Sequence, residues 1–422
     1  MKRELELENE CQDIIKQPKL EQPDDFDDVP TDPASFHADS GLAPPPNCDR
    51  NGNVPAKVPV PPVNNSPPTR KNLLVAEWGC QYKIRRTMGS GVYGNVFKVI
   101  DAKKGDAFAM KVLKICFQDS KEFFNSETAV MKHVSTARHR NLVNLVQSGE
   151  LTKSAHNCST LAILMDLCGP SIYTVMSDVK HNSPEGYVTF PIPDIKRISC
   201  QIVDGMKQLE KMKVFHLDLK PENIFFSLNS NKLKTTAKEF GTMIHMDDLQ
   251  IRIGDFGCSK FYEDHSETKK PTTVQTQNYR APEIMMGLPH TKKTDVWSVG
   301  CILYEMYTGE LMFYGNLHND TEFVQFAMMQ RVLCHHPSPR MWKEALKIRS
   351  PKVEISNGDV PVLKGRIING YPKVTPLFQH IRRGDFAAVD LFYFLDYILK
   401  IDPECRPTFD DLSVHGFFDG HH

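Results

Sequence analysis

The stretch His216–Asn223, which reads His-Leu-Asp-Leu-Lys-Pro-Glu-Asn, decides the fold, together with an Asp-Phe-Gly that begins at Asp255, 32 residues after the asparagine. Asp218 can accept the proton of a hydroxyl group, and Lys220 can bind a phosphate. Asn223 and Asp255 carry oxygen ligands of the kind that Mg²⁺ prefers. Together these side chains are the parts that phosphoryl transfer needs, so we expect the remaining parts of such a site elsewhere in the chain.

The composition is that of a globular protein with more than one folded unit. The 422 residues are 40% hydrophobic and 24% charged, and their net charge is −1, which indicates no general attraction to nucleic acid or to a membrane. Eleven scattered cysteines without a Cys-x-x-Cys pair predict reduced thiols in the nucleus or the cytoplasm. The longest apolar stretch, Val296–Phe313, is interrupted by Glu305 and Glu310, so it predicts a buried helix and not a membrane span.

Residues 1–78 differ in composition from the rest of the chain. This segment holds 13 of the 29 prolines and an acidic cluster at residues 24–28. Such a segment buries too little apolar surface to offset the entropy of ordering it. We therefore expect a disordered, proline-rich, acidic tail, and a docking peptide for a partner is the less favoured reading.

The pattern changes after the tail. Strands are predicted at five places: Tyr82–Met88, Asn95–Asp101, Ala107–Leu113, and near Leu142–Gln147 and Leu161–Asp166. Helical periodicity is predicted at four places: Asp119–Val134, Ile195–Met212, Thr294–Tyr307 and Phe386–Leu399. The prediction is an α+β fold with a small strand-rich lobe at residues 79–167 that contains one main helix, and a larger helical lobe at residues 168–418.

The first predicted hairpin contains Gly89, Ser90, Gly91 and Gly94 in a Gly-x-Gly-x-x-Gly pattern. Glycines let backbone amides approach phosphate oxygens closely. The pattern alone is weak, because dinucleotide-binding folds share it, but those need a helix directly afterwards. Here a strand follows, which favours a hairpin that covers phosphates.

Lys111 lies on the third predicted strand, between the apolar residues Met110 and Val112. Glu127, on the following helix, is the partner that would hold the Lys111 ammonium against the nucleotide phosphates. An exposed helical glutamate is the competing interpretation, but the flanking Phe124 places Glu127 near the inward face. The sequence therefore favours an ion pair.

With these motifs in this order, residues 82–418 resemble a eukaryotic protein kinase. The resemblance implies a bilobal kinase fold with a small antiparallel sheet, and ATP and Mg²⁺ as cofactors. It implies that the adenine lies between several positions of the chain. These are the roof residues Val96 and Ala109, the gatekeeper Met165, the hinge from Asp166 to Cys168, and the floor residue Phe225.

The resemblance also assigns the catalytic loop. It implies that Asp218 orients the substrate hydroxyl, that Lys220 neutralises charge on the transferred group, and that Asn223 and Asp255 hold magnesium. Leu217 stands where most kinases have an arginine that binds a phosphorylated activation loop. We therefore expect basal activity without loop phosphorylation.

Several further residues have structural roles by the same resemblance. Glu283 is expected to pair with Arg406, and Asp295 to hold the catalytic-loop backbone. Thr276 is placed to bond to Lys220 and Asp218. Cys258 is interpreted as a small packed residue, not a reactive thiol.

The segment Val274–Glu283 is similar to the branch of cyclin-dependent, mitogen-activated and CDC-like kinases. The long insert between Asn223 and Asp255, and the degraded signature Phe326–Arg331, resemble the LAMMER or CDC-like group within that branch. The group implies arginine/serine-rich protein substrates and autophosphorylation on tyrosine. Gln277 replaces an arginine tied to proline-directed specificity, so that specificity is not expected. The acidic residues of the segment 263–267 could attract basic peptides, although a solvated loop is the more ordinary interpretation.

The predicted function is an ATP-dependent serine/threonine protein kinase, with dual specificity left open. A pseudokinase scaffold that binds nucleotide without transfer is the alternative, and a small-molecule kinase is a third reading that the intact Ala281–Glu283 motif disfavours. The expected partners are protein substrates, without nucleic acid or membrane, and the expected state is a monomer.

Overall fold

The computed structural model describes the part of the chain that follows the acidic tail, with several gaps. The described residues are 73–91, 94–113, 120–153, 160–182, 186–228, 233–239, 241–262, 274–314, 321–356, 361–365 and 374–419. The acidic residues of the segment 263–267, which could attract basic peptides, lie outside these ranges. The tail up to residue 72 also lies outside them.

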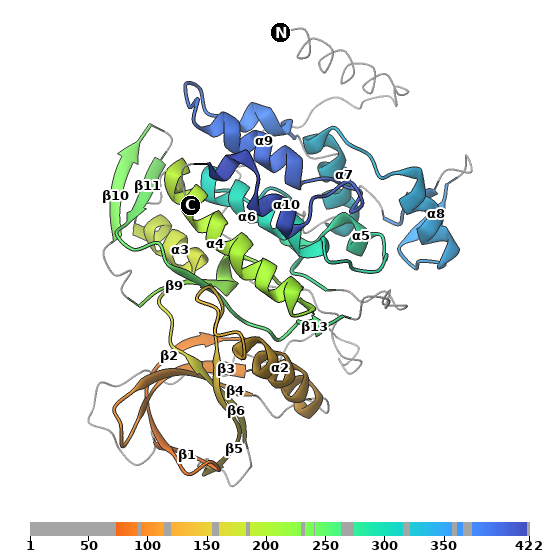
Figure 1. Cartoon of the computed structure of the whole chain (residues 1–422). Coiled ribbons are helices and arrows are strands. Elements are labelled where there is room, and N and C mark those ends of the chain that lie inside the picture. Colours follow the sequence, from red (N-terminus) through yellow and green to blue (C-terminus); the bar gives the residue numbers. More distant parts are fainter. Residues whose placement is uncertain are drawn as a thin grey trace, which may run out of the picture. The chain divides into compact units, whose positions relative to one another are not determined.

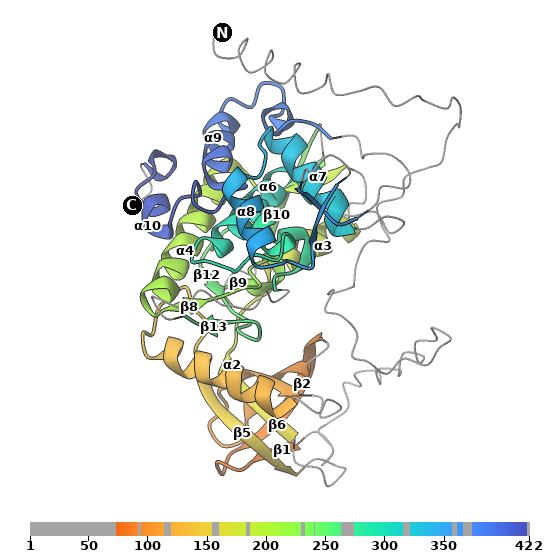
Figure 2. The same ribbon diagram turned by 90° about the vertical axis from the view of Figure 1, so that its right-hand side faces the viewer.

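The small lobe is a closed antiparallel barrel with one long helix beside it (Figures 1 and 2). The strands follow the order β1-β2-β3-β4-β6-β5 around the barrel. Their bounds are β1 Leu73–Ala76, β2 Gln81–Ser90, β3 Gly94–Asp101, β4 Ala107–Leu113, β5 Leu145–Lys153 and β6 Thr160–Asp166. The helix is α2, Ser120–Ser135, close to the predicted range.

Two sequence expectations for this lobe need correction. The tail was expected to reach residue 78, but Leu73–Ala76 forms β1, which pairs with β2 and with β5 and so closes the barrel. The strand expected near Leu142–Gln147 begins at Leu145. Leu142 instead makes an isolated bridge to Ile253 of the large lobe, so its apolar side chain belongs to the contact between the lobes.

Side chains of β4 point alternately into the barrel core and to the face that carries Lys111. Met110 is fully buried and packs in the barrel interior with Val99 of β3. Because neighbouring side chains of a strand point to opposite faces, Ala109 and Lys111 lie on the other face of the sheet. The small apolar core of the barrel thus positions Lys111 toward the second lobe.

The large lobe is mainly helical. Its helices are α3 Ile172–Asn182, α4 Ile192–Lys211, α5 Pro282–Met285, α6 Thr294–Thr308, α7 Thr321–Leu333, α8 Pro339–Lys347, α9 Ala388–Ile398 and α10 Phe409–Ser413. Nearly every residue of α6 is buried, as expected for a helix that is apolar on all sides. None of the described helices combines the length and the apolar character that a membrane-spanning helix needs. The predicted α+β architecture with two unequal lobes is confirmed.

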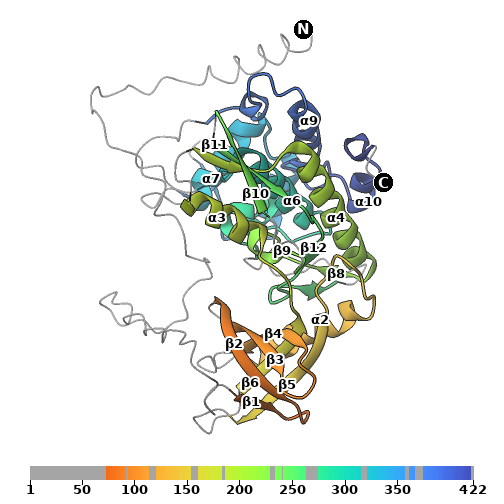
Figure 3. The ribbon, with the colours of Figure 1, turned by 90° about the vertical axis from the view of Figure 1, so that its left-hand side faces the viewer.

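Short strand pairs complete this lobe. They are formed by β8 Val214–Phe215 with β13 Lys260–Phe261, by β9 Ile224–Phe226 with β12 Ile251–Ile253, and by β14 Val353–Ile355 with β15 Pro361–Leu363. The insert between Asn223 and Asp255 folds into a hairpin of β10 Leu233–Lys238 and β11 Gly241–Met246, whose second strand pairs in parallel with β7 Tyr187–Thr189. Figure 3 shows this hairpin at the side of the lobe that also carries α3.

Candidate active site

Strand pairing brings the two halves of the sequence motif together. The catalytic loop runs from β8 to β9, and the Asp255 loop runs from β12 to β13. Because β8 pairs with β13 and β9 pairs with β12, both loops are held between the same two ladders. Asp218 and Asp255, 37 positions apart in the sequence, are therefore neighbours in space.

The backbone of the catalytic loop is fixed from below by a buried carboxylate. Asp295, in the first turn of α6, accepts hydrogen bonds of 2.9 Å from the backbone N–H groups of both His216 and Leu217. Leu217 has a φ of 59°, a left-handed conformation that is costly for a leucine. The two bonds to Asp295 hold the loop in this conformation.

His216 connects the two loops. Its side chain is fully buried, and its Nε2 lies 3.1 Å from the backbone oxygen of Gly254, directly before Asp255. Its Nδ1 accepts a 3.3 Å hydrogen bond from the backbone N–H of Asp218. The imidazole thus fixes the distance between the loop of Asp218 and the loop of Asp255.

Asp218 lies at the centre of a small network of charged and polar groups. The hydroxyl of Thr276 donates to its Oδ1 at 2.6 Å, and the ammonium of Lys220 lies 2.9 Å from its Oδ2. Lys220 also donates to the Thr276 hydroxyl at 2.8 Å. Burial on its own would lower the pKa of Lys220, but the nearby Asp218 carboxylate outweighs it, so the pKa is raised and the lysine stays charged.

Asn223 and Asp255 present oxygens that fit a magnesium ion. The amide nitrogen of Asn223 donates to Asp218, at 2.8 Å to the backbone oxygen and 3.3 Å to Oδ2, which leaves the amide oxygen directed elsewhere. The Lys111 ammonium lowers the pKa of the Asp255 carboxyl, so this group is ionised as a metal ligand must be. One carboxylate and one amide are a typical protein contribution to a Mg²⁺ that is otherwise held by phosphates and water. The described residues contain no cluster of three or more His, Cys, Asp or Glu side chains that could hold a metal by themselves.

Lys111 bridges the two lobes. Its Nζ lies 2.7 Å and 2.9 Å from the two carboxylate oxygens of Glu127 on α2, and 3.3 Å from Oδ1 of Asp255. Burial opposes the charge of this lysine, but the two carboxylates outweigh burial and raise its pKa. A charged ammonium is thus fixed beside the Asp255 carboxylate.

The glycine hairpin connects β2 to β3. In the ladder of β3 with β4, Val96 lies directly opposite Lys111, so both side chains are on the same face of the sheet. A side chain at Gly94 would come within 2.6 Å of the backbone oxygen of Val112, so this glycine is required by packing. A side chain at Gly89 would meet no protein atom within 4 Å, and one at Gly91 only a backbone oxygen at 3.9 Å. Ser90 bonds to Asn95 across the turn at 2.7 Å.

The residues predicted to surround an adenine also lie on this face or next to it. Ala109 is opposite Met165 in the β4–β6 ladder, and Cys168 is buried two residues after the end of β6. Burial raises the pKa of the Cys168 thiol to about 11. Phe225 is on β9, on the side of the large lobe, and its ring approaches Gly254.

Asp166, which the sequence predicts to belong to the hinge, has partners that sequence reasoning missed. Its Oδ2 accepts from the guanidinium of Arg252 at 2.7 Å and from the side-chain amide of Asn144 at 2.8 Å. Arg252 comes from β12 of the large lobe, so this carboxylate connects the hinge to the strand that precedes Asp255. Neither Arg252 nor Asn144 belongs to a motif, and no periodicity in the sequence points to them.

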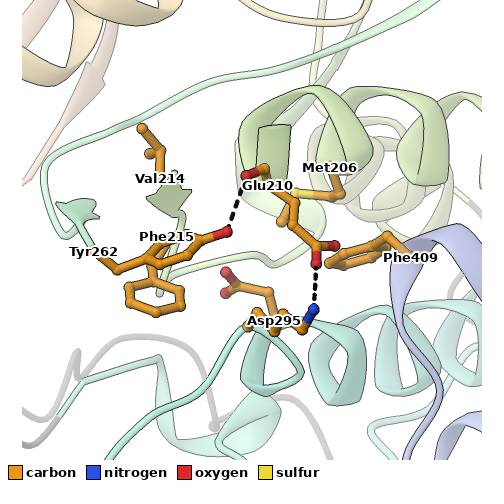
Figure 4. Close-up of a pocket in the computed structure, with 8 residues that line it drawn as sticks. Met206, Glu210, Val214, Phe215, Tyr262, Asp295 and Phe409 are labelled. Atoms are coloured by element: carbon orange, nitrogen blue, oxygen red, sulfur yellow. Dashed lines mark hydrogen bonds and ion pairs between the residues drawn. The ribbon is translucent and has the colours of Figure 1, made fainter. Parts of the chain in front are cut away.

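A cavity lies between α4, β8 and the start of α6, and Figure 4 shows the side chains that line it. Its volume is about 10 Å³, which is room for at most one water molecule. Glu210 pairs with Lys292 at 3.3 Å, and its backbone oxygen accepts a 2.9 Å hydrogen bond from the hydroxyl of Tyr262. This cavity is therefore too small for a ligand.

Comparisons with known proteins agree with this geometry. The family model described as "Protein kinase domain" matches residues 82–418. The human dual specificity protein kinase CLK4 is 30% identical over 341 residues, and human CLK1 is 31% identical over 348 residues. Each alignment covers 80% of this chain and 66% of the relative, so this chain spans slightly less than two thirds of their length.

Two further relatives show how far the similarity extends. The serine/threonine-protein kinase Doa of Drosophila melanogaster is 26% identical over 343 residues, which is 39% of its length. A crystal structure of a kinase domain superimposes with a TM-score of 0.67 at 26% identity, and covers 83% of this chain and 98% of that structure.

Proposed function

Because this chain belongs to the protein kinase family, we propose that it is an active serine/threonine protein kinase that transfers the γ-phosphate of ATP to protein hydroxyls. The observation that carries the proposal is the contact of Asp218 with both Lys220 and Thr276. A carboxylate that can take a hydroxyl proton lies beside the lysine that would neutralise the transferred phosphoryl group.

Each of these residues has a defined part in the proposed reaction. Asp218 accepts the hydrogen bond of the substrate hydroxyl and orients it for attack, while Lys220 stabilises the charge that develops on the phosphoryl oxygens. Asn223 and Asp255 would hold Mg²⁺, which neutralises the phosphate charge when it is bound. The bonds from Asp295 and His216 keep these groups in position before substrate arrives, so little reorganisation is needed.

The nucleotide would bind between the glycine hairpin and the hinge. Gly89 and Gly91 have room for a side chain within the protein, so packing does not explain why both are glycine. A phosphate that approaches the backbone amides at these positions would explain it. Lys111 would then bind the phosphates from the other side, held by Glu127.

The substrate proposal is an arginine/serine-rich protein, and it rests on the similarity to the CDC-like group. The similar human kinases CLK4 and CLK1 are named dual specificity kinases, so we extend the proposal to phosphorylation of tyrosine as a secondary activity. Gln277 supports a departure from proline-directed specificity, because it supplies no positive charge next to Thr276.

The proposed compartment is the nucleus or the cytoplasm. The seven cysteines in the described ranges form no disulfide bond with one another. Cysteines outside disulfides are typical of proteins that work in reducing compartments.

The test is transfer of labelled γ-phosphate from Mg·ATP by the purified full chain. One peptide is arginine/serine-rich and one carries proline after the target serine, and the Asp218→Asn variant serves as the blank. Asp204→Asn, which changes a half-exposed carboxylate on α4, is the matched control and should retain full activity. Transfer to the first peptide that disappears only in Asp218→Asn is the expected result. Nucleotide binding without transfer to either peptide would favour the scaffold reading.

A further inference from the structure

A buried arginine holds the part of the activation segment that contacts Asp218. The Arg280 side chain is only 5% exposed. Its guanidinium donates to the backbone oxygen of Val274 at 3.1 Å and to that of Gln275 at 3.0 Å. These two carbonyls belong to the residues directly before Thr276, so Arg280 fixes the backbone on which Thr276 is placed.

This backbone is in a strained conformation that needs support. Gln275 has a φ of 66° and donates its backbone N–H to the backbone oxygen of Leu217 at 3.0 Å. Thr276 then donates its own backbone N–H to Oδ1 of Asp218 at 3.1 Å, in addition to its hydroxyl. A glutamine with a left-handed backbone persists only where the surrounding contacts hold it. The position of Thr276, and with it the two hydrogen bonds to the Asp218 carboxylate, depends on this conformation of Gln275.

The charge of Arg280 is balanced by Glu322, in the first turn of α7. One carboxylate oxygen of Glu322 accepts from Arg280 and the other accepts from Lys352. The next turn of α7 adds a second contact, because the amide of Gln325 donates to Asn278 at 3.1 Å. Helix α7 is thus attached to the segment 274–280 at two points.

Without the Glu322 carboxylate, the buried charge of Arg280 would have no counter-ion. A buried cation without its partner strongly destabilises the folded protein. In kinases whose activation segment is ordered by phosphorylation, an added phosphate supplies the anion for an arginine. In this chain the anion is the carboxylate of Glu322. Position 217, where most kinases have the arginine that binds the phosphate, is a leucine and provides no cation.

We propose that Glu322 is a positioning residue for phosphoryl transfer, a built-in anion that holds the segment 274–280 against Asp218 without phosphorylation. The inference rests on the proposed kinase activity and adds how that activity is maintained. Glu322 acts through Arg280 and does not touch the substrate or the nucleotide.

The experiment uses the full chain after phosphatase treatment, with removal of phosphate checked by mass spectrometry. Glu322→Gln removes the charge, Glu322→Asp keeps it on a shorter side chain, and Glu344→Gln is the matched control. Glu344 forms an ion pair with Lys347 within α8, and its side chain is 37% exposed. Steady-state kinetics give kcat and KM for peptide and for ATP, and hydrogen exchange reports the backbone amides of residues 274–281.

We expect the dephosphorylated wild-type protein to be active. Glu322→Gln should lower kcat/KM for the peptide about tenfold or more while KM for ATP changes by less than about twofold. Exchange should become faster in residues 274–281 and not in α4 or α6. Glu322→Asp should fall between wild type and Glu322→Gln, and it decides the question if Glu322→Gln does not fold. Glu344→Gln should behave as wild type.

Three results would overturn the inference. The first is kinetics and exchange that are unchanged in both Glu322 variants. The second is a parallel loss of ATP affinity, peptide turnover and protection throughout the large lobe, which would make Glu322 a residue of the general fold. The third is a wild-type protein that is active only when phosphorylated. A wild-type protein inactive in every state would instead refute the proposed function, and this inference with it.

Discussion

Glu283 and Arg406 form an ion pair with two hydrogen bonds of 2.9 Å each, and their side chains are 1% and 0% exposed. The guanidinium also donates to the backbone oxygens of Lys293 and Lys400. The carboxylate accepts a further bond from the hydroxyl of Thr294, at the start of α6. The pair therefore fastens the end of the activation segment to the loop before α10.

Removing one member of this pair should destabilise the large lobe strongly. We expect Arg406→Met to lower the free energy of unfolding by about 3–5 kcal/mol, because the Glu283 carboxylate would remain buried without a cation. Urea unfolding followed by tryptophan fluorescence measures the change. Arg340→Met is the control, since the Arg340 side chain is 53% exposed and its partner Asp402 keeps the hydrogen bonds from the Ser338 hydroxyl and the Glu404 backbone N–H. Equal effects of the two substitutions would contradict the assigned role of Arg406.

Glu127→Gln should weaken magnesium binding. In the wild-type protein, Nζ of Lys111 pairs with carboxylate oxygens of both Glu127 and Asp255, at 2.7 Å and 3.3 Å. Without the Glu127 carboxylate, the ammonium is expected to pair more closely with Asp255 and to compete with the metal for it. The concentration of Mg²⁺ needed for half-maximal phosphate transfer should rise about tenfold. An unchanged Mg²⁺ requirement, with KM for ATP alone affected, would show that Lys111 does not compete for Asp255.

Cys258 should be unreactive although it directly follows the Asp255 motif. Burial, together with the carboxylates of Asp218 and Asp255, raises the pKa of its thiol to about 12. The reactive thiolate is therefore scarce at neutral pH. Exposed Cys405 provides the internal comparison. Peptide mapping after brief treatment with iodoacetamide at pH 8 should find Cys405 modified before Cys258, and faster modification of Cys258 would refute the interpretation as a packed residue.

The sequence predicted those parts of the site that lie within short motifs, and the family resemblance also supplied distant pairs such as Glu283–Arg406 and Thr276–Asp218. It missed the partners that lie outside the motifs. Asp218, Lys220 and Asn223 share one loop, so their spacing alone indicates their chemistry. Strand β1 was missed because Leu73–Ala76 follows a proline-rich tail, and its partners β2 and β5 decide its conformation.

The contacts made by residues outside the motifs could not be predicted from local patterns. Glu322 is 42 positions from Arg280, and Arg252 is 86 positions from Asp166. A glutamate in the first turn of a helix is favoured by the helix dipole on any fold, so nothing local distinguishes Glu322 from a surface residue. Only the packing of α7 against the activation segment reveals its partner.

Leu217→Arg should destabilise the protein and should not create dependence on loop phosphorylation. Leu217 is fully buried and has a left-handed backbone conformation. A guanidinium at this position would have to enter the fully buried space of the Leu217 side chain, at a cost of about 2–4 kcal/mol in unfolding free energy. Leu217→Met, which conserves volume and polarity, should cost less than about 1.5 kcal/mol. Chemical unfolding compares the two variants, and an Arg variant as stable as the Met variant would contradict the argument.

Glu305 should make stability depend on pH in a direction opposite to that of most carboxylates. Burial raises the pKa of Glu305 from its ordinary value of 4.5 to about 7, although the Tyr279 hydroxyl, which donates to it at 2.6 Å, acts against this. Between pH 4.5 and pH 7 the folded protein keeps a proton that the unfolded chain has released. The contribution of Glu305 to the free energy of unfolding therefore falls as the pH rises through this window and stays constant above it.

Glu305→Gln should remove this dependence, because the amide is neutral at every pH and its oxygen can still accept from Tyr279. The variant and the wild type should be similarly stable near pH 5, and the variant should be more stable by about 1–3 kcal/mol at pH 8. Urea unfolding at both pH values gives the comparison, and taking the difference between the proteins cancels the titration of all other groups. A variant that is equally destabilised at both pH values would mean that the Glu305 carboxylate is not protonated in the folded protein.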